Sequence, residues 1–455
     1  MNENEVIMLN EGVFFRLYNK KCYVCNTITK KDYIFNEAVF DILLVIKKRE
    51  KVSLKQLAEE LSKIYQEPVE VVYSSIQSFV EMMVNEYLLT YIDNTNGYNN
   101  DRYLTEFIQE LADTKQLFSV LIELTYQCNE KCKHCYVEAE PHDRKPEMNT
   151  KEVESVLDAL ADANVCEITF TGGEIFCRKD VVHLIQYATE KGFLVNVFSN
   201  GTLPTIEQIL CLKRCNIRSF QTSLYGSSAK VHDEITGVKG AFEKTLHTLK
   251  VFTDIGVPTC IKYTVMQQNV KDYEDMLSLA KEIGADIQVG LSIRPTMSAR
   301  TENLKYRVGY EDLQKISYGE LGRFISEYEK EEQIDFSKKG ICNAGFSNLT
   351  IDPYGDIYIC SGIPIILGNV KEDSIEQIWK HSTKLKKWQQ YKLSDIPCMK
   401  NCKYARECTF CPAQAYLETG DAFSKYEEAC SIAKAQYFAK EVRNNEESRT
   451  NRNKV

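Results

Sequence analysis

The stretch FSVLIELTYQCNEKCKHCY, residues 118–136, joins an apolar run to a loop that carries Cys128, Cys132 and Cys135. The apolar run is typical of a buried strand, and the cysteine loop begins where that strand ends. In barrels built from parallel strands, active sites lie at this carboxyl end. Three thiolates on one short loop are enough to hold three irons of a four-iron cluster, and they leave the fourth iron open.

Zinc is the alternative that the same cysteines leave open. A structural zinc site takes four ligands, usually as two close pairs separated by a longer spacer, and no second pair completes this loop. His134 is a candidate fourth ligand, but it lies between Cys132 and Cys135, where joint ligation is awkward. The spacing therefore favours an iron–sulfur cluster.

Strands and helices alternate after the cysteine loop, in the pattern of a parallel sheet with crossover helices. Six strands over about 180 residues suit an incomplete barrel, because a full eight-stranded barrel typically takes about 250 residues. We therefore predict an α/β fold with a partial (β/α)6 barrel. The predicted strands are 119–125, 166–172, 194–199, 219–225, 259–265 and 287–293.

Composition, charge and cysteine content limit the classes of protein to which this chain can belong. The chain has 455 residues, 44% hydrophobic and 27% charged, with no apolar stretch long enough to cross a bilayer. Its first residues, MNENEVIMLNEG, carry acids where an export signal carries bases. Seventeen cysteines without such a signal favour metal binding over disulfides, which are rare in the cytosol. We therefore expect a cytoplasmic protein that does not bind a membrane, and the net charge of −9 argues against binding of nucleic acid.

A glycine-rich turn, TGGE, ends the second predicted strand with Gly172, Gly173 and Glu174. Adjacent glycines open the backbone to a close ligand, and a carboxylate pairs well with an ammonium group. One strand after CxxxCxxC, this turn resembles the motif that binds the amino group of S-adenosylmethionine in the radical SAM superfamily. The resemblance implies that the cofactor contacts further residues, namely Tyr136, Ser199, Asn200, Ser223 and Gly290.

Seven more cysteines follow with the spacing C-x17-C, a gap, and C-x3-C-x5-C-x2-C-x18-C. The pattern resembles the SPASM domain, a cysteine-rich extension of radical SAM enzymes that carries auxiliary iron–sulfur clusters. Two fully ligated four-iron clusters need eight thiolates, so seven leave one iron open for a carboxylate or a substrate thiolate. Zinc knuckles remain the alternative for these pairs. The resemblance implies three 4Fe-4S clusters in all, with the first auxiliary cluster on Cys342, Cys360 and Cys411 and the second on Cys398, Cys402, Cys408 and Cys430.

The region before residue 92 reads as a small winged helix-turn-helix module. Runs 13–27 and 32–36 predict strands, and helical runs follow at 38–48, 53–65 and 69–89, with Ser53 as an N-cap. The helices lack a basic recognition face, which weakens a DNA-binding interpretation. The module resembles instead the RiPP recognition element. That resemblance implies a leader-peptide groove between the strand at Tyr33, Ile34 and Phe35 and the last helix.

The resemblances cover nearly the whole chain. They imply a recognition element at 1–92, a linker at 93–116, a radical SAM core at 117–300, a bridging region at 301–341, a SPASM domain at 342–443 and a disordered tail at 444–455. Together they imply an enzyme that modifies a ribosomally made precursor peptide and receives electrons from a flavodoxin or ferredoxin. We expect thioether crosslinking. Carbon–carbon crosslinking, epimerisation, sulfatase-type maturation and a redox-sensing DNA regulator are the alternatives.

Overall fold

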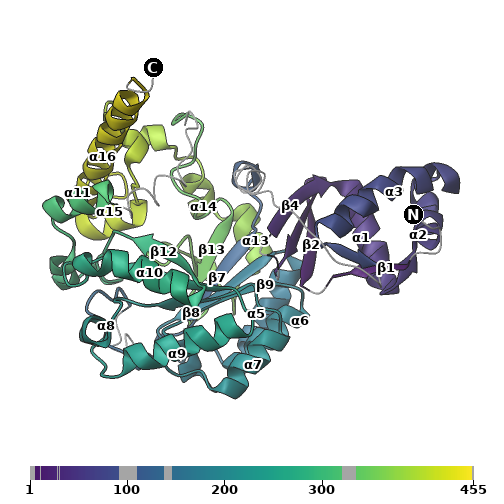
Figure 1. Ribbon diagram of the computed structural model, residues 1–455, viewed down its shortest axis with the longest axis horizontal. Coiled ribbons are helices and arrows are strands. Elements are labelled where there is room, and N and C mark those ends of the chain that lie inside the picture. Colours follow the sequence, from purple (N-terminus) through teal and green to yellow (C-terminus); the bar gives the residue numbers. More distant parts are fainter. Residues whose placement is uncertain are drawn as a thin grey trace. The chain divides into compact units, whose positions relative to one another are not determined.

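The computed structural model describes residues 6–10, 12–27, 29, 31–91, 110–137, 146–319 and 335–452, with backbone only for 444–452. The described chain divides into two compact units (Figure 1). Residues 1–116 make up most of the first unit, and nearly all of the remaining chain makes up the second.

Two small antiparallel sheets belong to the N-terminal unit. One has the order β2-β3-β4 and contains β2 (Val13–Tyr18), β3 (Lys21–Asn26) and β4 (Lys31–Asn36). The turn between β2 and β3 uses Asn19 and Lys20 at positive φ, as the polar turn of the sequence predicts. The other sheet has the order β5-β1-β6 and contains β1 (Val6–Leu9), β5 (Val52–Ser53) and β6 (Leu89–Tyr91).

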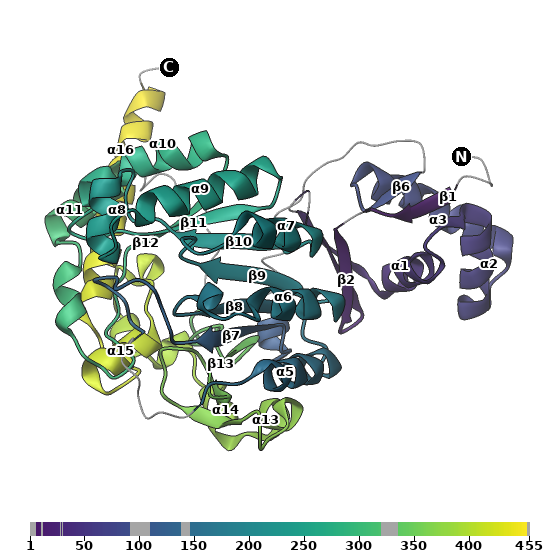
Figure 2. The same cartoon turned by 90° about the horizontal axis from the view of Figure 1, so that it is seen from below.

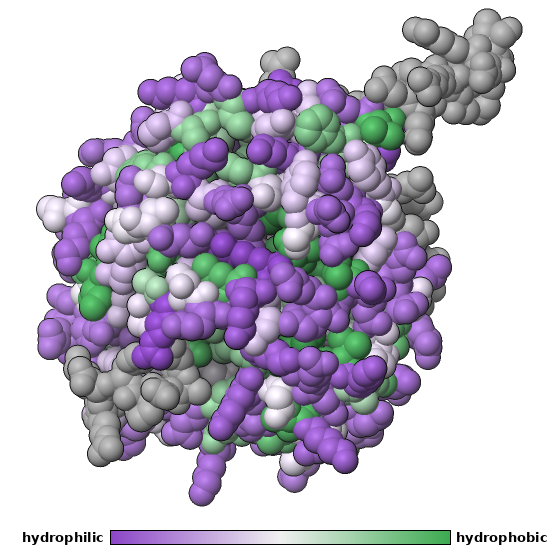
Figure 3. Space-filling view, turned by 90° about the vertical axis from the view of Figure 1, so that its left-hand side faces the viewer, coloured by the Kyte–Doolittle hydropathy of each residue, from purple (hydrophilic) through white to green (hydrophobic). Residues whose placement is uncertain are grey.

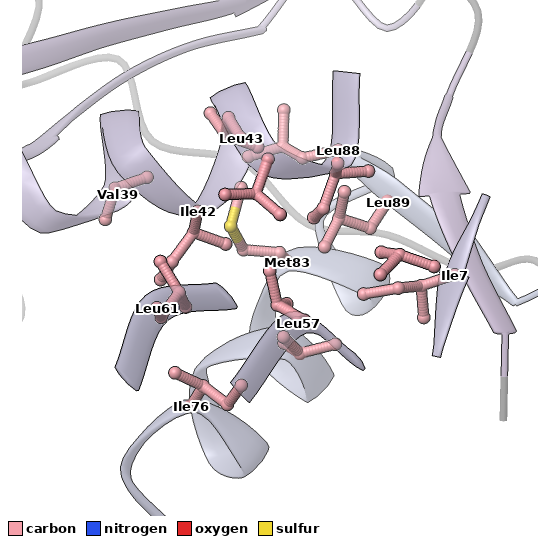
Figure 4. Close-up of a cluster of buried hydrophobic side chains, with 14 of the residues drawn as sticks. Ile7, Val39, Ile42, Leu43, Leu57, Leu61, Ile76, Met83, Leu88 and Leu89 are labelled. Carbon is pink, nitrogen blue, oxygen red and sulfur yellow. The ribbon is translucent and has the colours of Figure 1, made fainter. Parts of the chain in front are cut away.

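Three helices complete this unit: α1 (Glu37–Arg49), α2 (Leu54–Tyr65) and α3 (Val69–Asn85). Ser53 caps α2 in a capping box with Gln56, which confirms the predicted N-cap. The helices pack through buried aliphatic side chains such as Leu43, Leu57 and Met83 (Figure 4). Burying each such side chain stabilises the fold by about 1.5–3 kcal/mol.

The predicted run 69–89 is too long for the helix that forms. The chain leaves α3 after Asn85, turns at Tyr87 with φ +54°, and enters β6 at Leu89 to pair with β1. Apolar periodicity continues through this turn, so the sequence pattern alone does not mark the end of the helix. The elements match those expected of a winged module, and its identification as one stays a prediction.

The second unit is built on a sheet whose first six strands are parallel, as predicted. Successive helices α5 (Thr150–Asp162), α6 (Val181–Glu190), α7 (Ile206–Arg214) and α9 (Ala241–Asp254) cover one face of it (Figure 2). Helices α8 (Ala229–Thr236) and α10 (Tyr273–Ile283) complete the crossovers. The strands are β7 (Ser119–Thr125), β8 (Glu167–Gly172), β9 (Leu194–Ser199), β10 (Ser219–Ser223), β11 (Thr259–Thr264) and β12 (Asp286–Gly290).

The cysteine-rich region extends the same sheet instead of forming a separate one. Strand β13 (Asn348–Ile351) pairs in parallel with β7, and β14 (Asp356–Tyr358) and β15 (Ile366–Asn369) follow as an antiparallel hairpin. The sheet order is β12-β11-β10-β9-β8-β7-β13-β14-β15. This pairing places the carboxyl-terminal cysteines beside the first barrel strand.

The remaining helices lie in the second unit. They are α11 (Tyr310–Tyr318), α13 (Ile375–His381), α14 (Thr383–Trp388), α15 (Pro412–Thr419) and α16 (Glu427–Arg452). The predicted disordered tail at 444–455 is wrong for residues 444–452, because α16 continues through them. A helix that is already nucleated elongates readily through residues such as Glu and Arg. Of the predicted linker, 93–109 lie outside the described residues and 110–113 are helical, and 320–334 of the bridging region also lie outside.

One face of the molecule is mostly hydrophilic, with small scattered hydrophobic areas (Figure 3). Within the described residues, no helix is both long enough and apolar enough to cross a membrane.

Candidate functional site

The loop after β7 brings Cys128, Cys132 and Cys135 together. Its backbone is held by α8, because the amides of Lys131 and Lys133 donate to the carbonyls of Thr236 and Ile235 at 2.9 and 3.0 Å. Burial raises the pKa of the Cys128 thiol to about 12, and the charge on Cys135 contributes. The pKa of Cys132 is raised well above its ordinary value, first by burial and then by nearby charges that include both other cysteines.

His134 does not take part in this thiol group as a zinc ligand would. Its ring packs edge-to-face against Tyr225, with the ring centroids 4.6 Å apart. Burial lowers the pKa of His134 to about 4, so the imidazole is neutral at pH 7. The ring therefore belongs to the aromatic packing around the loop.

The glycine turn lies directly against the cysteine loop. Gly172 has φ +141°, and a β-carbon there would lie 2.2 Å from the carbonyl oxygen of Thr125. A β-carbon on Gly173 would lie 2.4 Å from the carbonyl oxygen of Gln127. The amides of Gly173 and Glu174 donate to these same two oxygens at 2.7 Å. The two glycines are therefore required for the backbones of β8 and the cysteine loop to approach each other.

Glu174 links the ends of β8 and β9 through its buried carboxylate. It accepts hydrogen bonds from the Ser199 hydroxyl at 2.9 and 3.0 Å, from the Asn200 amide at 2.6 Å and from the Phe176 amide at 2.9 Å. A carboxylate offers about four acceptor positions, and three protein donors use part of this capacity. The ammonium partner that the resemblance implies for this side chain stays a prediction.

Asn129 is a site residue that the sequence reasoning missed. Its side chain accepts a hydrogen bond from Asn200 at 2.8 Å and donates one to Thr202, also at 2.8 Å. The cysteine loop is thus bonded to the end of β9 as well as to the glycine turn. In the sequence, the only signal that pointed to Asn129 was its position inside the CxxxCxxC motif.

The other predicted cofactor contacts lie at the same edge of the sheet. Ser223 is the last residue of β10, and Gly290 is the last residue of β12, where its carbonyl accepts a hydrogen bond from Val265. The guanidinium of Arg294, which follows β12, lies 3.5 Å from the ring centroid of Tyr136. Arg294 was also missed, because a lone arginine after a strand carries no motif.

The seven later cysteines gather as two groups. Charges on Cys342 and Cys411 contribute to raising the pKa of Cys360 to about 11, after the larger effect of burial. Burial raises the pKa of Cys408 to about 12, and Cys430, Cys398 and Cys402 contribute in that order. The assignment of these groups of three and four to two auxiliary clusters stays a prediction.

Among the described residues, no group of three or more His, Cys, Asp or Glu side chains is placed to hold a single metal ion. A four-iron cluster binds each thiolate to a separate iron, so it takes thiols spread around a larger volume. The donor chemistry of these thiols suits such clusters, and the close glycine turn suits a cofactor held at the open iron.

An apolar cavity of about 390 Å³, here called the N-terminal cavity, lies in the first unit between the end of β4 and helix α3. Of the predicted groove residues, Phe35 lines it, and Tyr33 and Ile34 do not. Tyr33 is 7% exposed and donates a hydrogen bond to the Glu86 carboxylate at 2.8 Å. Val71, Val72, Ser75, Ile76 and Phe79 of α3 form the opposite wall.

Three thiols at the end of a parallel strand, next to a double-glycine turn, define an enzyme that combines an iron–sulfur cluster with S-adenosylmethionine. Comparison with known proteins agrees with this class. Residues 122–280 match the radical SAM superfamily, and residues 342–411 match SPASM, an iron–sulfur cluster-binding domain.

Comparison with individual proteins identifies the family of this chain more closely. It is 30% identical to the antilisterial bacteriocin subtilosin biosynthesis protein AlbA of Bacillus subtilis, over 69% of this chain and 70% of that one. It is 28% identical to the AdoMet-dependent heme synthase of Methanosarcina barkeri, over 66% and 92%. The crystal structure of Streptococcus suis SuiB bound to precursor peptide SuiA shares the fold, with a TM-score of 0.61, 16% identity and coverage of 93% and 99%. The chain belongs to the radical SAM enzymes that carry a SPASM domain.

Proposed function

We propose that this enzyme forms thioether crosslinks in a ribosomally synthesised precursor peptide. The observation that carries the proposal is the count of seven later cysteines, which the SPASM resemblance divides into groups of three and four. A group of three thiolates leaves one iron of a four-iron cluster without a protein thiolate. A cysteine thiolate of the peptide is the ligand that suits this position.

The residues have separate tasks in this proposal. Cys128, Cys132 and Cys135 would hold the cluster, which together with S-adenosylmethionine would supply the radical chemistry that removes a hydrogen atom from carbon. The turn at Gly172 and Gly173 holds the cofactor close to the cysteine loop, and the protein contributes position and exclusion of water. Tyr136, Ser199, Asn200, Ser223 and Gly290 line the cofactor. Cys342, Cys360 and Cys411 hold the first auxiliary cluster, and Cys398, Cys402, Cys408 and Cys430 hold the second.

The N-terminal unit supplies the argument for a leader peptide. Strand β4 is at the edge of its sheet, so its outer backbone groups can pair with an added strand. The N-terminal cavity lies beside the end of β4 and offers an apolar pocket for a side chain of that added strand. Main-chain pairing then supplies affinity, and the cavity supplies specificity. We place this reaction in the cytoplasm, with a flavodoxin or ferredoxin as the electron donor.

Mass spectrometry tests the proposal directly. The neighbouring reading frames are searched for a short cysteine-containing peptide, this peptide is co-produced with the enzyme, and its mass is measured. Each bridge is expected to remove two hydrogens and one free thiol. Thiol alkylation before and after treatment separates a thioether from a carbon–carbon crosslink, which also loses two hydrogens but keeps its thiols. An unchanged mass with inverted stereocentres would show epimerisation and contradict the proposal.

The relationship to an AdoMet-dependent heme synthase favours a second candidate, a heme-forming reaction. Production of heme by the purified enzyme, with no change in the peptide, would support that candidate over the first. A non-enzymatic DNA regulator is tested by salt-dependent DNA binding, and a flat response disposes of it.

A further inference from the structure

A second cavity lies between β7 and the loop that follows Cys360. Its volume is about 150 Å³, and we call it the barrel cavity. Glu123 of β7, Met297, Tyr358 of β14 and residues 361–364 line it. A cavity of this size accommodates about one benzene ring, so it has room for one side chain of a peptide. The barrel cavity adjoins Cys360, one of the three thiols that leave an iron position open.

Glu123 presents a carboxylate oxygen to this cavity. The residue is 1% exposed, and its Oε2 accepts a hydrogen bond from the Tyr126 hydroxyl at 2.9 Å. Its Oε1 has no hydrogen-bond partner among the described residues. A buried oxygen without a donor costs free energy, so a carboxylate in this state is suited to a ligand that brings a donor. The cavity is the place from which such a donor reaches Oε1.

The positive charge of Arg294 acts on Glu123, on the first cysteine loop and on the later cysteines. Arg294 donates to the Ser361 hydroxyl at 3.2 Å and lies over the Tyr136 ring. Burial raises the pKa of Cys135, of Cys360 and of Glu123, and the positive charge of Arg294 opposes that rise in each. One guanidinium therefore lies within electrostatic range of the first cysteine loop, the later cysteines and the cavity carboxyl.

The pKa of Glu123 suits a group that exchanges protons near neutral pH. Burial raises its pKa from 4.5 to about 7, the Tyr126 hydrogen bond and the Arg294 charge oppose this effect, and Asp352 adds to it. Tyr358 faces the same cavity from β14. A carboxyl with a pKa near the working pH both takes and releases protons efficiently.

We propose that Glu123 is a catalytic residue that accepts the proton lost by the peptide when a crosslink forms. The inference rests on the proposed peptide-modifying function. A thioether forms one C–S bond and breaks one C–H and one S–H bond. The C–H hydrogen leaves as an atom to the 5′-deoxyadenosyl radical, one electron passes to an iron–sulfur cluster, and the sulfur-bound proton passes to Oε1 of Glu123. A carbon–carbon crosslink releases the same proton and electron.

The test uses Glu123→Gln in the cluster-loaded full-length enzyme, with a short cysteine-containing peptide found by searching the neighbouring reading frames. Crosslinked peptide and 5′-deoxyadenosine are measured in the same reaction. Glutamine keeps the shape and an acceptor oxygen, so 5′-deoxyadenosine formation is expected to stay within about twofold of wild type. Crosslinked peptide is expected to fall about a hundredfold, the typical contribution of a general base. Glu376→Gln, on the exposed surface of α13, is the matched control and is expected to match wild type in both measurements.

The pH dependence gives a second measurement. A base must be deprotonated to accept a proton, so the ratio of crosslinked peptide to 5′-deoxyadenosine is expected to rise with pH through about 7 in the wild type. In Glu123→Gln the ratio is expected to be independent of pH. Glu123→Asp keeps an acid at this position and is expected to recover part of the pH-dependent crosslinking.

Thermal unfolding measures the effect of Glu123 protonation on stability, without a catalytic reaction. Because the folded pKa of Glu123 lies above its ordinary value of 4.5, its contribution to stability is full below about 4.5 and is lost as pH rises through about 7. The melting temperature of Glu123→Gln minus that of wild type is therefore expected to increase from about pH 5 to about pH 8. A difference that does not change with pH would overturn the proposed protonation behaviour.

The results of these experiments distinguish a failure of this inference from a failure of the proposed function. If the wild type crosslinks the peptide and Glu123→Gln does so at the wild-type ratio, the proton-accepting role is wrong and the function stands. An equal loss of 5′-deoxyadenosine and crosslinked peptide in Glu123→Gln would place Glu123 before hydrogen removal and also overturn that role. If the wild type modifies no peptide, both the function and the inference fail.

Discussion

Gly173 illustrates how one missing side chain determines the geometry of the site. The sequence assigns the glycine pair to close approach by a ligand, and the structure shows that the first close approach is by the protein's own backbone. The Gln127 carbonyl lies 2.4 Å from the position of a β-carbon on Gly173, and no real β-carbon occupies such a position. The residue is therefore required to place the cysteine loop before any cofactor binds.

We predict that Gly173→Ala displaces the cysteine loop from the glycine turn. The substitution forces apart the backbones that carry the two 2.7 Å hydrogen bonds, so cofactor affinity and 5′-deoxyadenosine formation are expected to fall at least about tenfold. Gly309→Ala is the matched control, because Gly309 has φ −68° and nothing lies within 4 Å of its added β-carbon. Equal S-adenosylmethionine affinity in the two variants, measured by calorimetry, would contradict the prediction.

At the scale of elements, β4 and the three helices α1, α2 and α3 together line the N-terminal cavity, which none of them forms alone. The strand contributes a sheet edge and Phe35, and the helix contributes an apolar wall. Periodicity predicts both elements, because the alternation and the helical repeat are local properties of the chain. Which strand residue faces the helix depends on how they pack, and the structure selects Phe35 and buries Tyr33.

Val71→Asp is expected to weaken binding of the leader peptide by about tenfold or more, because it places a charge at the mouth of an apolar cavity. Val71 is 51% exposed, so the helix itself tolerates the change. Gln77→Asp adds the same charge to α3 at a position that does not line the cavity, and it is expected to bind like wild type. Fluorescence anisotropy with a labelled leader peptide measures both. If both variants bind equally well, the groove is not the leader site.

At the scale of the whole molecule, pairing of β13 with β7 joins the barrel to the cysteine-rich region in one sheet. The SPASM resemblance predicts a boundary at residue 342. In the structure, hydrogen bonding across the sheet continues past this boundary, from β7 to β13 and on to β14. The hairpin that precedes Cys360 is thereby held against the first strand, which carries Glu123 and leads into the cysteine loop.

Iron content tests the three-cluster arrangement. We expect about twelve irons per chain after anaerobic reconstitution, because three four-iron clusters are predicted. Replacing Cys128, Cys132 and Cys135 with alanine is expected to leave about eight irons and to abolish cleavage of S-adenosylmethionine. Iron assay and metal analysis measure these values. About four irons in the wild type, or zinc in place of the remainder, would contradict the auxiliary clusters.

The sequence by itself determined the features that depend on neighbours along the chain. Strand β7, the capping of α2 by Ser53, the CxxxCxxC loop and the order of strands after it follow from local periodicity and spacing. Only the tertiary structure placed Asn129 against Asn200, Arg294 against Tyr136 and the Glu123 carboxylate in a closed cavity. These contacts join residues far apart in the sequence, and side-chain burial and charge depend on which elements pack together. A motif identifies the ligands of a site, whereas packing decides the surroundings that tune them.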